Sequence, residues 1–220
     1  MNRRTYILVL LLVSMITVFG QDQNGTYSFL NSTNSARVAA LGGISIPIYD
    51  SDIQLATYNP SLINSDIDNN MALSYVDYYR DINFGTVQYG KTFEKAGSFV
   101  GTLQFHNYGR FYYAEENGYQ DGSTFTVSDY MFNVGWGRML NDNWTIGANL
   151  KFAGIQYENS SAFALAVDVA GTYMTSDGWC LSLAARNIGY ELYKNYEGDH
   201  SKLPFRMQLG MSKKLEHLPF

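Results

Sequence analysis

Between Ser128 and Asn187 the chain alternates bulky apolar residues with small or polar ones, and short turns separate the alternating segments. A period of two is the spacing of β-strands whose two faces meet different surroundings. The opposite positions carry mostly Gly, Ala, Ser and Asn. The pattern therefore predicts antiparallel strands with one bulky and one small face. The bulky positions of the first two segments are Tyr130, Phe132, Val134, Trp136, Trp144, Ile146, Leu150 and Phe152.

The length of these segments bears on the fold class. They run about 10 to 14 residues, which a tilted strand needs to cross a bilayer, whereas strands of soluble proteins are usually about 5 or 6 residues long. Trp and Tyr stand near the ends of the bulky faces, as in the aromatic girdles of outer-membrane barrels. We therefore interpret the chain as all-β, an antiparallel transmembrane outer-membrane β-barrel. A secreted β-sandwich adhesin, with bulky faces turned inward, is the alternative.

About eight strands in up-and-down order are expected. The connections after the second, fourth and sixth strands are short, whereas two long ones, Tyr108 to Val127 and Ile188 to Pro204, follow the third and seventh strands. Bacterial barrels have short periplasmic turns and longer outer loops, so we expect both long loops on one side, opposite the N-terminus. The expected strands are residues 71–79, 84–92, 97–107, 128–139, 144–157, 161–174, 179–187 and 205–214.

Residues 1–20 have the features of a cleavable secretory signal peptide: Arg3 and Arg4, then an apolar run to Phe19, then Gly20. A membrane anchor is the alternative, but the run of about 14 residues is short for a span of about 20. No later run is long enough for a transmembrane helix, so the chain is predicted to be exported and non-helical.

Residues 21–70 are irregular and polar, and Ser35 is expected to cap a short helical turn that ends at Gly42. Ahead of a barrel, such a segment fits a hatch or plug inside it; a periplasmic tail is the alternative. The expected organisation is a signal peptide (1–20), a hatch (21–70) and a barrel (71–220).

Composition supports a lipid-facing surface. Charged residues are 16% of the chain, below the roughly 25% of soluble domains. The formal net charge of −5 becomes −7 when Arg3 and Arg4 leave with the signal peptide, which disfavours nucleic acid as a partner. The single Cys180 cannot form an internal disulfide.

The sequence shows no motif for catalysis, a phosphate, a cofactor or a metal. His106, His200 and His217 lack metal-ligand spacing and are expected to be solvated or at a lumen edge. We therefore predict no catalytic, cofactor-binding or metal-binding residue and a non-enzymatic protein.

Three charged residues fall on the small face of consecutive strands: Lys151, Asp168 and Arg186. On the lipid face a Lys or Arg at the bilayer midplane costs about 2 to 4 kcal/mol. We therefore expect all three to face the lumen and to pair there. The alternative to a structural network is a role in polarising a ligand or conducting ions.

Several separate motifs resemble one family. They are the run Tyr27 to Gly43 (YSFLNSTNSARVAALGG), the Asn59-Pro60 turn, the stretch Leu73 to Tyr79, and Leu203-Pro204-Phe205 with Gln208-Leu209-Gly210. Together they resemble the PorQ family of the type IX secretion system of Bacteroidetes, within the FadL/PorV-like outer-membrane β-barrel group. The resemblance covers almost all of the chain after residue 20.

The resemblance implies a barrel of about 14 strands with an N-terminal hatch, so the eight strands expected here indicate an N-terminal portion truncated at its C-terminus. A small barrel closed by eight strands is the alternative.

For function, the resemblance implies a non-enzymatic part of the attachment complex that joins secreted cargo to lipopolysaccharide at the cell surface. Such a barrel would anchor PorZ, while the sortase-like PorU does the chemistry and a PorV-like barrel belongs to the same complex. The other functional alternative is a FadL-like channel for hydrophobic small molecules.

Overall fold

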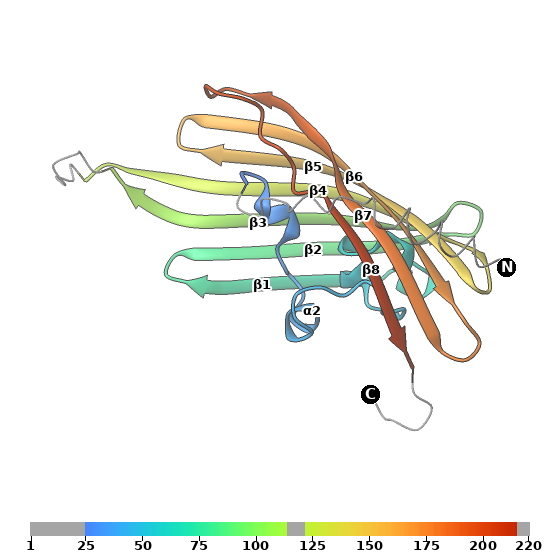
Figure 1. Ribbon diagram of the computed structural model, residues 1–220. Coiled ribbons are helices and arrows are strands. Elements are labelled where there is room, and N and C mark those ends of the chain that lie inside the picture. The colour runs from blue at the N-terminus through green and yellow to red at the C-terminus, as the bar shows by residue number, and fades with distance from the viewer. Residues whose placement is uncertain (1–24, 114–121, 215–220) are drawn as a thin grey trace, which may run out of the picture.

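The computed structural model describes residues 25–113 and 122–214, so the predicted signal peptide (1–20) lies outside the described residues. In the described ranges eight strands form one antiparallel sheet. Each strand pairs with its neighbours in sequence, which makes a meander (Figure 1). The strands are β1 (Met71–Tyr79), β2 (Ile82–Phe93), β3 (Gly97–Tyr112), β4 (Thr124–Asn141), β5 (Trp144–Tyr157), β6 (Ser160–Met174), β7 (Trp179–Lys194) and β8 (Arg206–Lys213).

The sheet is open, because the two edge strands β1 and β8 each pair with one neighbour and not with each other. The alternative of a small barrel closed by these eight strands is therefore wrong. The β-sandwich is also wrong for the described part of the chain, because all eight strands belong to one sheet and no second sheet packs on it. The predicted all-β antiparallel class and the up-and-down order are confirmed.

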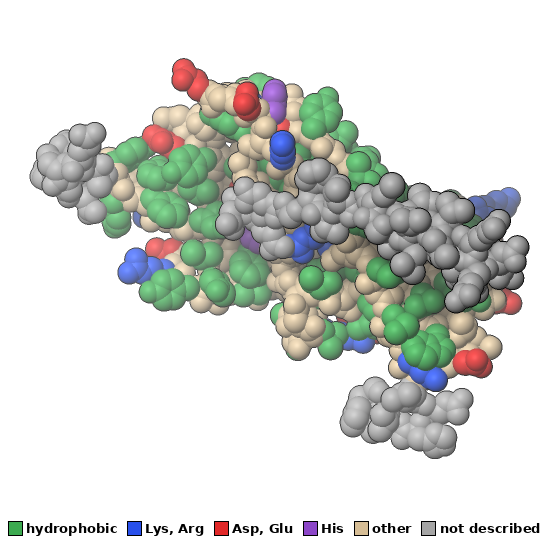
Figure 2. Space-filling model, in the orientation of Figure 1, with side chains coloured by type: hydrophobic (Ala, Val, Ile, Leu, Met, Phe, Trp, Pro, Cys, Tyr) green, Lys and Arg blue, Asp and Glu red, His purple; other side chains and the backbone are tan. Residues whose placement is uncertain are grey.

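The two faces of the sheet differ in side-chain size, as the alternation predicted. The small side chains of the central strands are buried, among them Ala153, Ala164 and Ala184. Their bulky neighbours point to the opposite face and are exposed, so green apolar groups spread over the surface in Figure 2. Exposed large side chains come from every strand and include Leu73, Val87, Leu103, Phe132, Leu150, Val169, Leu183 and Leu209.

The third and fourth strands are longer than predicted. A bulge lies in β3 between Asn107 and Arg110. The Oδ1 of Asn107 accepts a hydrogen bond from the N–H of Gly109 at 2.7 Å, and Gly109 has a φ of +82°. A bulge shifts the alternation by one residue, so the period of two ends at residue 107 although pairing continues to Tyr112. The expected loop Tyr108–Val127 is therefore a shorter connection, 113–123.

The seventh strand is extended for the same reason. Arg186 and Asn187 are both buried, and Asn187 has a φ of +58°. Beyond this bulge the buried position moves from even to odd numbers, so Glu191 is buried while Tyr190 is exposed. The expected loop Ile188–Pro204 is wrong in its first half, because β7 runs to Lys194 and the connection is 195–205. Both long connections lie at the same end of the sheet, as predicted.

The N-terminal segment, residues 25–70, has five short helices: η1 (Ser28–Asn31), α2 (Ala36–Ala40), η2 (Ile53–Thr57), η3 (Pro60–Leu62) and η4 (Ser65–Ile67). The predicted helical turn is confirmed, since the Ser35 side chain accepts a hydrogen bond from the N–H of Val38 and the chain turns at Gly42, with a φ of +93°. No helix in the described ranges is long and apolar enough to cross a membrane.

The N-terminal segment covers the small face of the sheet. It is hydrogen-bonded to both edge strands: the Ser74 hydroxyl on β1 donates to the Asn34 carbonyl, and the Ser212 hydroxyl on β8 donates to the Pro47 carbonyl. In the centre, Ser61 bonds to Thr172 on β6 at 2.7 Å. Since residues 25–70 reach both edges and the centre, the sheet curves around them (Figure 1).

Glycines on the central strands make room for this contact. A Cβ at Gly147 would overlap the carbonyl oxygen of Pro60, and one at Gly137 would overlap that of Ile63. The end of the N-terminal segment lies beside β2, where the N–H of Asn69 donates to the carbonyl of Gly90. Glycine at these strand positions permits close approach of two backbones.

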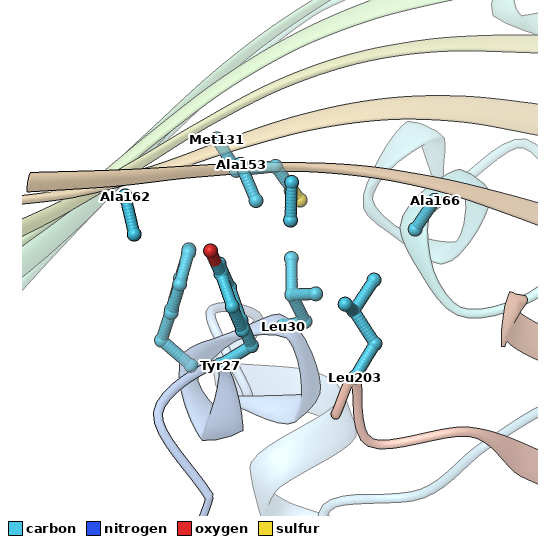
Figure 3. Packing of buried hydrophobic residues seen from close by; sticks show 9 residues of the cluster. Tyr27, Leu30, Met131, Ala153, Ala162, Ala166 and Leu203 are labelled. Atoms are coloured by element: carbon cyan, nitrogen blue, oxygen red, sulfur yellow. The ribbon is translucent and has the colours of Figure 1, made fainter. Parts of the chain in front are cut away.

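The segment begins beside the long connections. Thr26 Oγ1 lies 2.9 Å from Ser201 Oγ, and Tyr27 and Leu30 pack against Leu203 and small side chains of β5 and β6 (Figure 3). The first described residues lie at the same end as those loops, whereas β1 begins at the opposite end of the sheet. The segment therefore crosses the small face from one end of the strands to the other.

Candidate functional site

The structure brings the three predicted charged residues together. Lys151 on β5, Asp168 on β6 and Arg186 on β7 lie on the covered face of adjacent strands. The Nζ of Lys151 is 2.7 Å from Oδ2 of Asp168, and the Nε of Arg186 is 4.0 Å from the same oxygen. Their side chains are 0%, 0% and 4% exposed. They form one buried cluster with a carboxylate between two cations.

Amide groups complete the bonding of the carboxylate. Oδ1 of Asp168 accepts from the backbone N–H of Asn187 at 2.7 Å, and Oδ2 accepts from Nδ2 of Asn149 at 3.1 Å. The Lys151 ammonium also donates to Oδ1 of Asn187 at 2.9 Å. A buried ion pair is tolerated when such extra hydrogen bonds satisfy its lone pairs and protons.

The cluster also holds the N-terminal segment. Nη2 of Arg186 donates to the Thr57 carbonyl at 3.3 Å, and its guanidinium carbon lies 5.7 Å from the centre of the Tyr58 ring. Asn149 donates to the Ala56 carbonyl at 3.2 Å. The charges on three strands thus fix one short stretch of the segment on the sheet.

Sequence reasoning missed Asn187, which hydrogen-bonds to strands β5 and β6, to the N-terminal segment and to the connection 195–205. Its Nδ2 donates to Oδ1 of Asn31 and to the carbonyl of Pro204, both at 3.0 Å. The signal was present: asparagine tolerates the left-handed conformation better than most residues, and Asn187 stands where the alternation of β7 breaks.

The arrangement is closed rather than reactive. The cluster offers no exposed acceptor or donor to a ligand, because its side chains are enclosed by the sheet and the N-terminal segment. Its hydrogen bonds connect the sheet to that segment. This geometry suits a structural network better than ligand polarisation or conduction.

His106 and His200 belong to no group of metal ligands in the part of the chain that the structure describes. His106 was expected to be solvated or at a lumen edge, but it is 6% exposed and stacks on Phe84 with ring centres 5.0 Å apart. His200 is exposed, with Nδ1 4.0 Å from Oε2 of Glu191, and His217 lies outside the described residues. Within the described ranges, no three His, Cys, Asp or Glu side chains gather as metal ligands would.

A second buried carboxylate, Glu191, ties the connection 195–205 to the sheet. It accepts hydrogen bonds from the Tyr196 hydroxyl at 2.8 Å and from the N–H of Ser201 at 2.7 Å. Burial, followed by the charge of Glu191, raises the pKa of Tyr27. Because the predicted strand ended at Asn187, Glu191 was expected in a solvated loop, and its buried hydrogen bonds to the connection 195–205 were not predicted.

A cavity of about 580 Å³ lies near the long-connection end of β3 to β6. Its walls are largely aromatic and aliphatic, and Asp129 is a carboxylate among the lining residues. Tyr108, Phe111, Ile155, Tyr157 and Tyr196 lie with Asp129 in the cavity wall.

No family model matches this sequence, and a search of curated proteins finds no match.

Proposed function

We propose that this chain forms part of an outer-membrane β-barrel, with residues 21–70 as its hatch, and that it acts without catalysis as an anchor in the type IX attachment complex. Further strands would pair with the free edges of β1 and β8 to close the barrel. In this proposal the partner is PorZ-like, and PorU-like and PorV-like proteins belong to the same complex.

The observation that carries the membrane part of the proposal is the inverted burial of neighbouring residues. Leu150 is 39% exposed, whereas the adjacent Lys151 is fully buried and ion-paired. In water the bulky face would expose apolar side chains from all eight strands to solvent. Large contiguous apolar patches of this kind mark surfaces that contact a membrane or another protein. In a bilayer the same surface faces lipid tails, and the charges face an interior.

The hatch part rests on the contacts of the N-terminal segment. The segment reaches both edges of the open sheet, and it is held at the centre by the Lys151–Asp168–Arg186 cluster. Such a segment would remain inside when the edges close. The anchoring part rests on the family resemblance, and we place the partner surface on the long connections 113–123 and 195–205.

Extraction tests the membrane part. Outer membranes from cells that express the full chain are washed with alkaline carbonate and then solubilised with detergent. A barrel stays in the pellet until detergent is added, whereas release by carbonate would refute membrane integration.

A pull-down tests the anchoring part. The tagged protein is isolated from outer membranes and its companions are identified by mass spectrometry. The double variant Glu197→Lys/Asp199→Lys reverses two exposed charges on the connection 195–205, and Asp142→Lys with Asp177→Lys does the same in the short turns at the opposite end. Loss of a PorZ-like protein with the first pair alone supports anchoring through that loop. Equal recovery with both pairs would contradict it.

The cavity favours a second candidate, a channel or binding protein for hydrophobic small molecules. Its volume of about 580 Å³ falls within the range of about 300 to 1,000 Å³ typical of small-molecule sites. Deletion of the gene separates the candidates: lost surface retention of cargo supports the anchor, and lost uptake of an apolar compound with cargo intact supports the channel.

A further inference from the structure

We propose that the cavity bounded by β3 to β6 and Tyr196 binds an organic cation, a protonated amine with an aromatic or aliphatic body, with Asp129 as its counter-ion. This inference is independent of any role in secretion. It assigns a ligand class to a cavity for which the chain supplies one carboxylate and several aromatic walls.

Asp129 is positioned for this role. It is 4% exposed, and its Oδ2 accepts a hydrogen bond from the Tyr108 hydroxyl at 2.7 Å. Both residues line the cavity. Among the described residues, no Lys or Arg nitrogen lies within 4 Å of this carboxylate, in contrast to Asp168. A buried carboxylate without a cation partner is costly, and a bound ammonium group would supply that partner.

The nearest imidazole and ammonium groups have other partners. His106 is the cross-strand neighbour of Asp129, and its Nε2 lies 3.0 Å from Ser32 Oγ and 2.9 Å from Gln104 Nε2. Lys194 lies over the Tyr196 ring, 4.8 Å from its centre, and bonds to a carbonyl of the connection 195–205. Neither neutralises the carboxylate.

The rest of the lining fits the body of such a ligand. Phe111, Tyr157 and Tyr196 present aromatic rings, and Ile155 adds an aliphatic wall. Aromatic faces attract cations that lie within about 6 Å of the ring centre, and they also cover apolar groups. The same carboxylate would repel a fatty acid or any other anion of equal size.

A matched ligand series tests the proposal. The protein, extracted from outer membranes and transferred to lipid nanodiscs, is titrated calorimetrically with 4-phenylbutylammonium, 4-phenylbutanol and 4-phenylbutyrate, which share one body and differ in charge. A hydrogen bond to a charged group corresponds to about a tenfold to hundredfold change in affinity. The ammonium is expected to bind at least about tenfold more tightly than the carboxylate, with the alcohol between them.

Asp129→Asn is expected to abolish that preference, whereas Asp142→Asn, in an exposed turn at the other end of the sheet, should preserve it. Equal binding of the three ligands, preference for the anion, or no binding at all would overturn the proposal on the unsubstituted protein. A preference that survives Asp129→Asn in a folded protein would overturn the role of this carboxylate.

Discussion

Replacement of Asp168 by asparagine should destabilise the protein more than replacement of its closer cationic partner, Lys151, by methionine. Asp168 lies between Lys151 and Arg186, at 2.7 Å and 4.0 Å. Asp168→Asn removes the negative charge and leaves two buried cations facing each other. Lys151→Met instead leaves a neutral pair of Asp168 and Arg186, with the amide donors to the carboxylate still in place.

The expected magnitudes differ accordingly. Removal of one partner from a buried ion pair costs about 3 to 5 kcal/mol when the other charge stays unpaired, so Asp168→Asn should lower the free energy of unfolding by that amount. Loss of a hydrogen bond to a charged group costs about 1.5 to 3 kcal/mol, which is the range expected for Lys151→Met. A difference of about 2 kcal/mol corresponds to about a 30-fold change in the unfolding equilibrium.

Guanidinium unfolding of the protein in lipid vesicles, followed by tryptophan fluorescence, measures these values. Asp77→Asn is the matched control, because Asp77 is an exposed strand carboxylate and surface substitutions usually change stability by less than about 0.5 kcal/mol. A Lys151→Met variant that is as unstable as Asp168→Asn, or less stable, would refute the charge balance inferred for the cluster.

Two further predictions concern the N-terminal segment. Gly147→Ala should lower the free energy of unfolding by about 1 to 3 kcal/mol, the range for overpacking, because the added Cβ would overlap the Pro60 carbonyl oxygen. Gly154→Ala on the same strand is the control, because a Cβ there meets no atom within 4 Å, and it should change stability little. Equal effects of the two substitutions would contradict this packing. Burial raises the pKa of the Tyr58 hydroxyl in the folded protein. The contribution of this hydroxyl to stability is therefore fully present below the unfolded pKa of about 10 and is lost as the pH rises through the higher folded pKa. Absorbance titration compared with that of Tyr58→Phe measures the folded pKa, and ionisation of Tyr58 at or below pH 10 would contradict the prediction.

The faces of the sheet could be predicted because they depend on a local period of two. Ser35 was also readable, since a helix cap is formed within three residues along the chain. Lys151, Asp168 and Arg186 could be assigned to one face for the same reason, because in-phase positions of antiparallel neighbours share a face.

The rest depends on contacts between distant residues. The bulges at Gly109 and Asn187 change the phase of the alternation. The strands predicted from the alternation therefore end before β3 and β7 do. The buried role of Glu191 follows from that phase change. The position of Thr26 beside Ser201 depends on residues about 175 apart, and no local pattern encodes such a contact.

The most direct measurement of which face meets lipid compares two adjacent residues on β5. In vesicles, with Cys180 replaced by alanine, Leu150→Cys and Lys151→Cys are each treated with a lipid-soluble maleimide and with an aqueous one. Because Leu150 is exposed on the bulky face and Lys151 is buried under the N-terminal segment, Leu150→Cys should react with the lipid-soluble reagent alone, and Lys151→Cys with neither. Reaction of Lys151→Cys with the lipid-soluble reagent, or of Leu150→Cys with the aqueous one, would contradict the assignment of the bulky face to the bilayer.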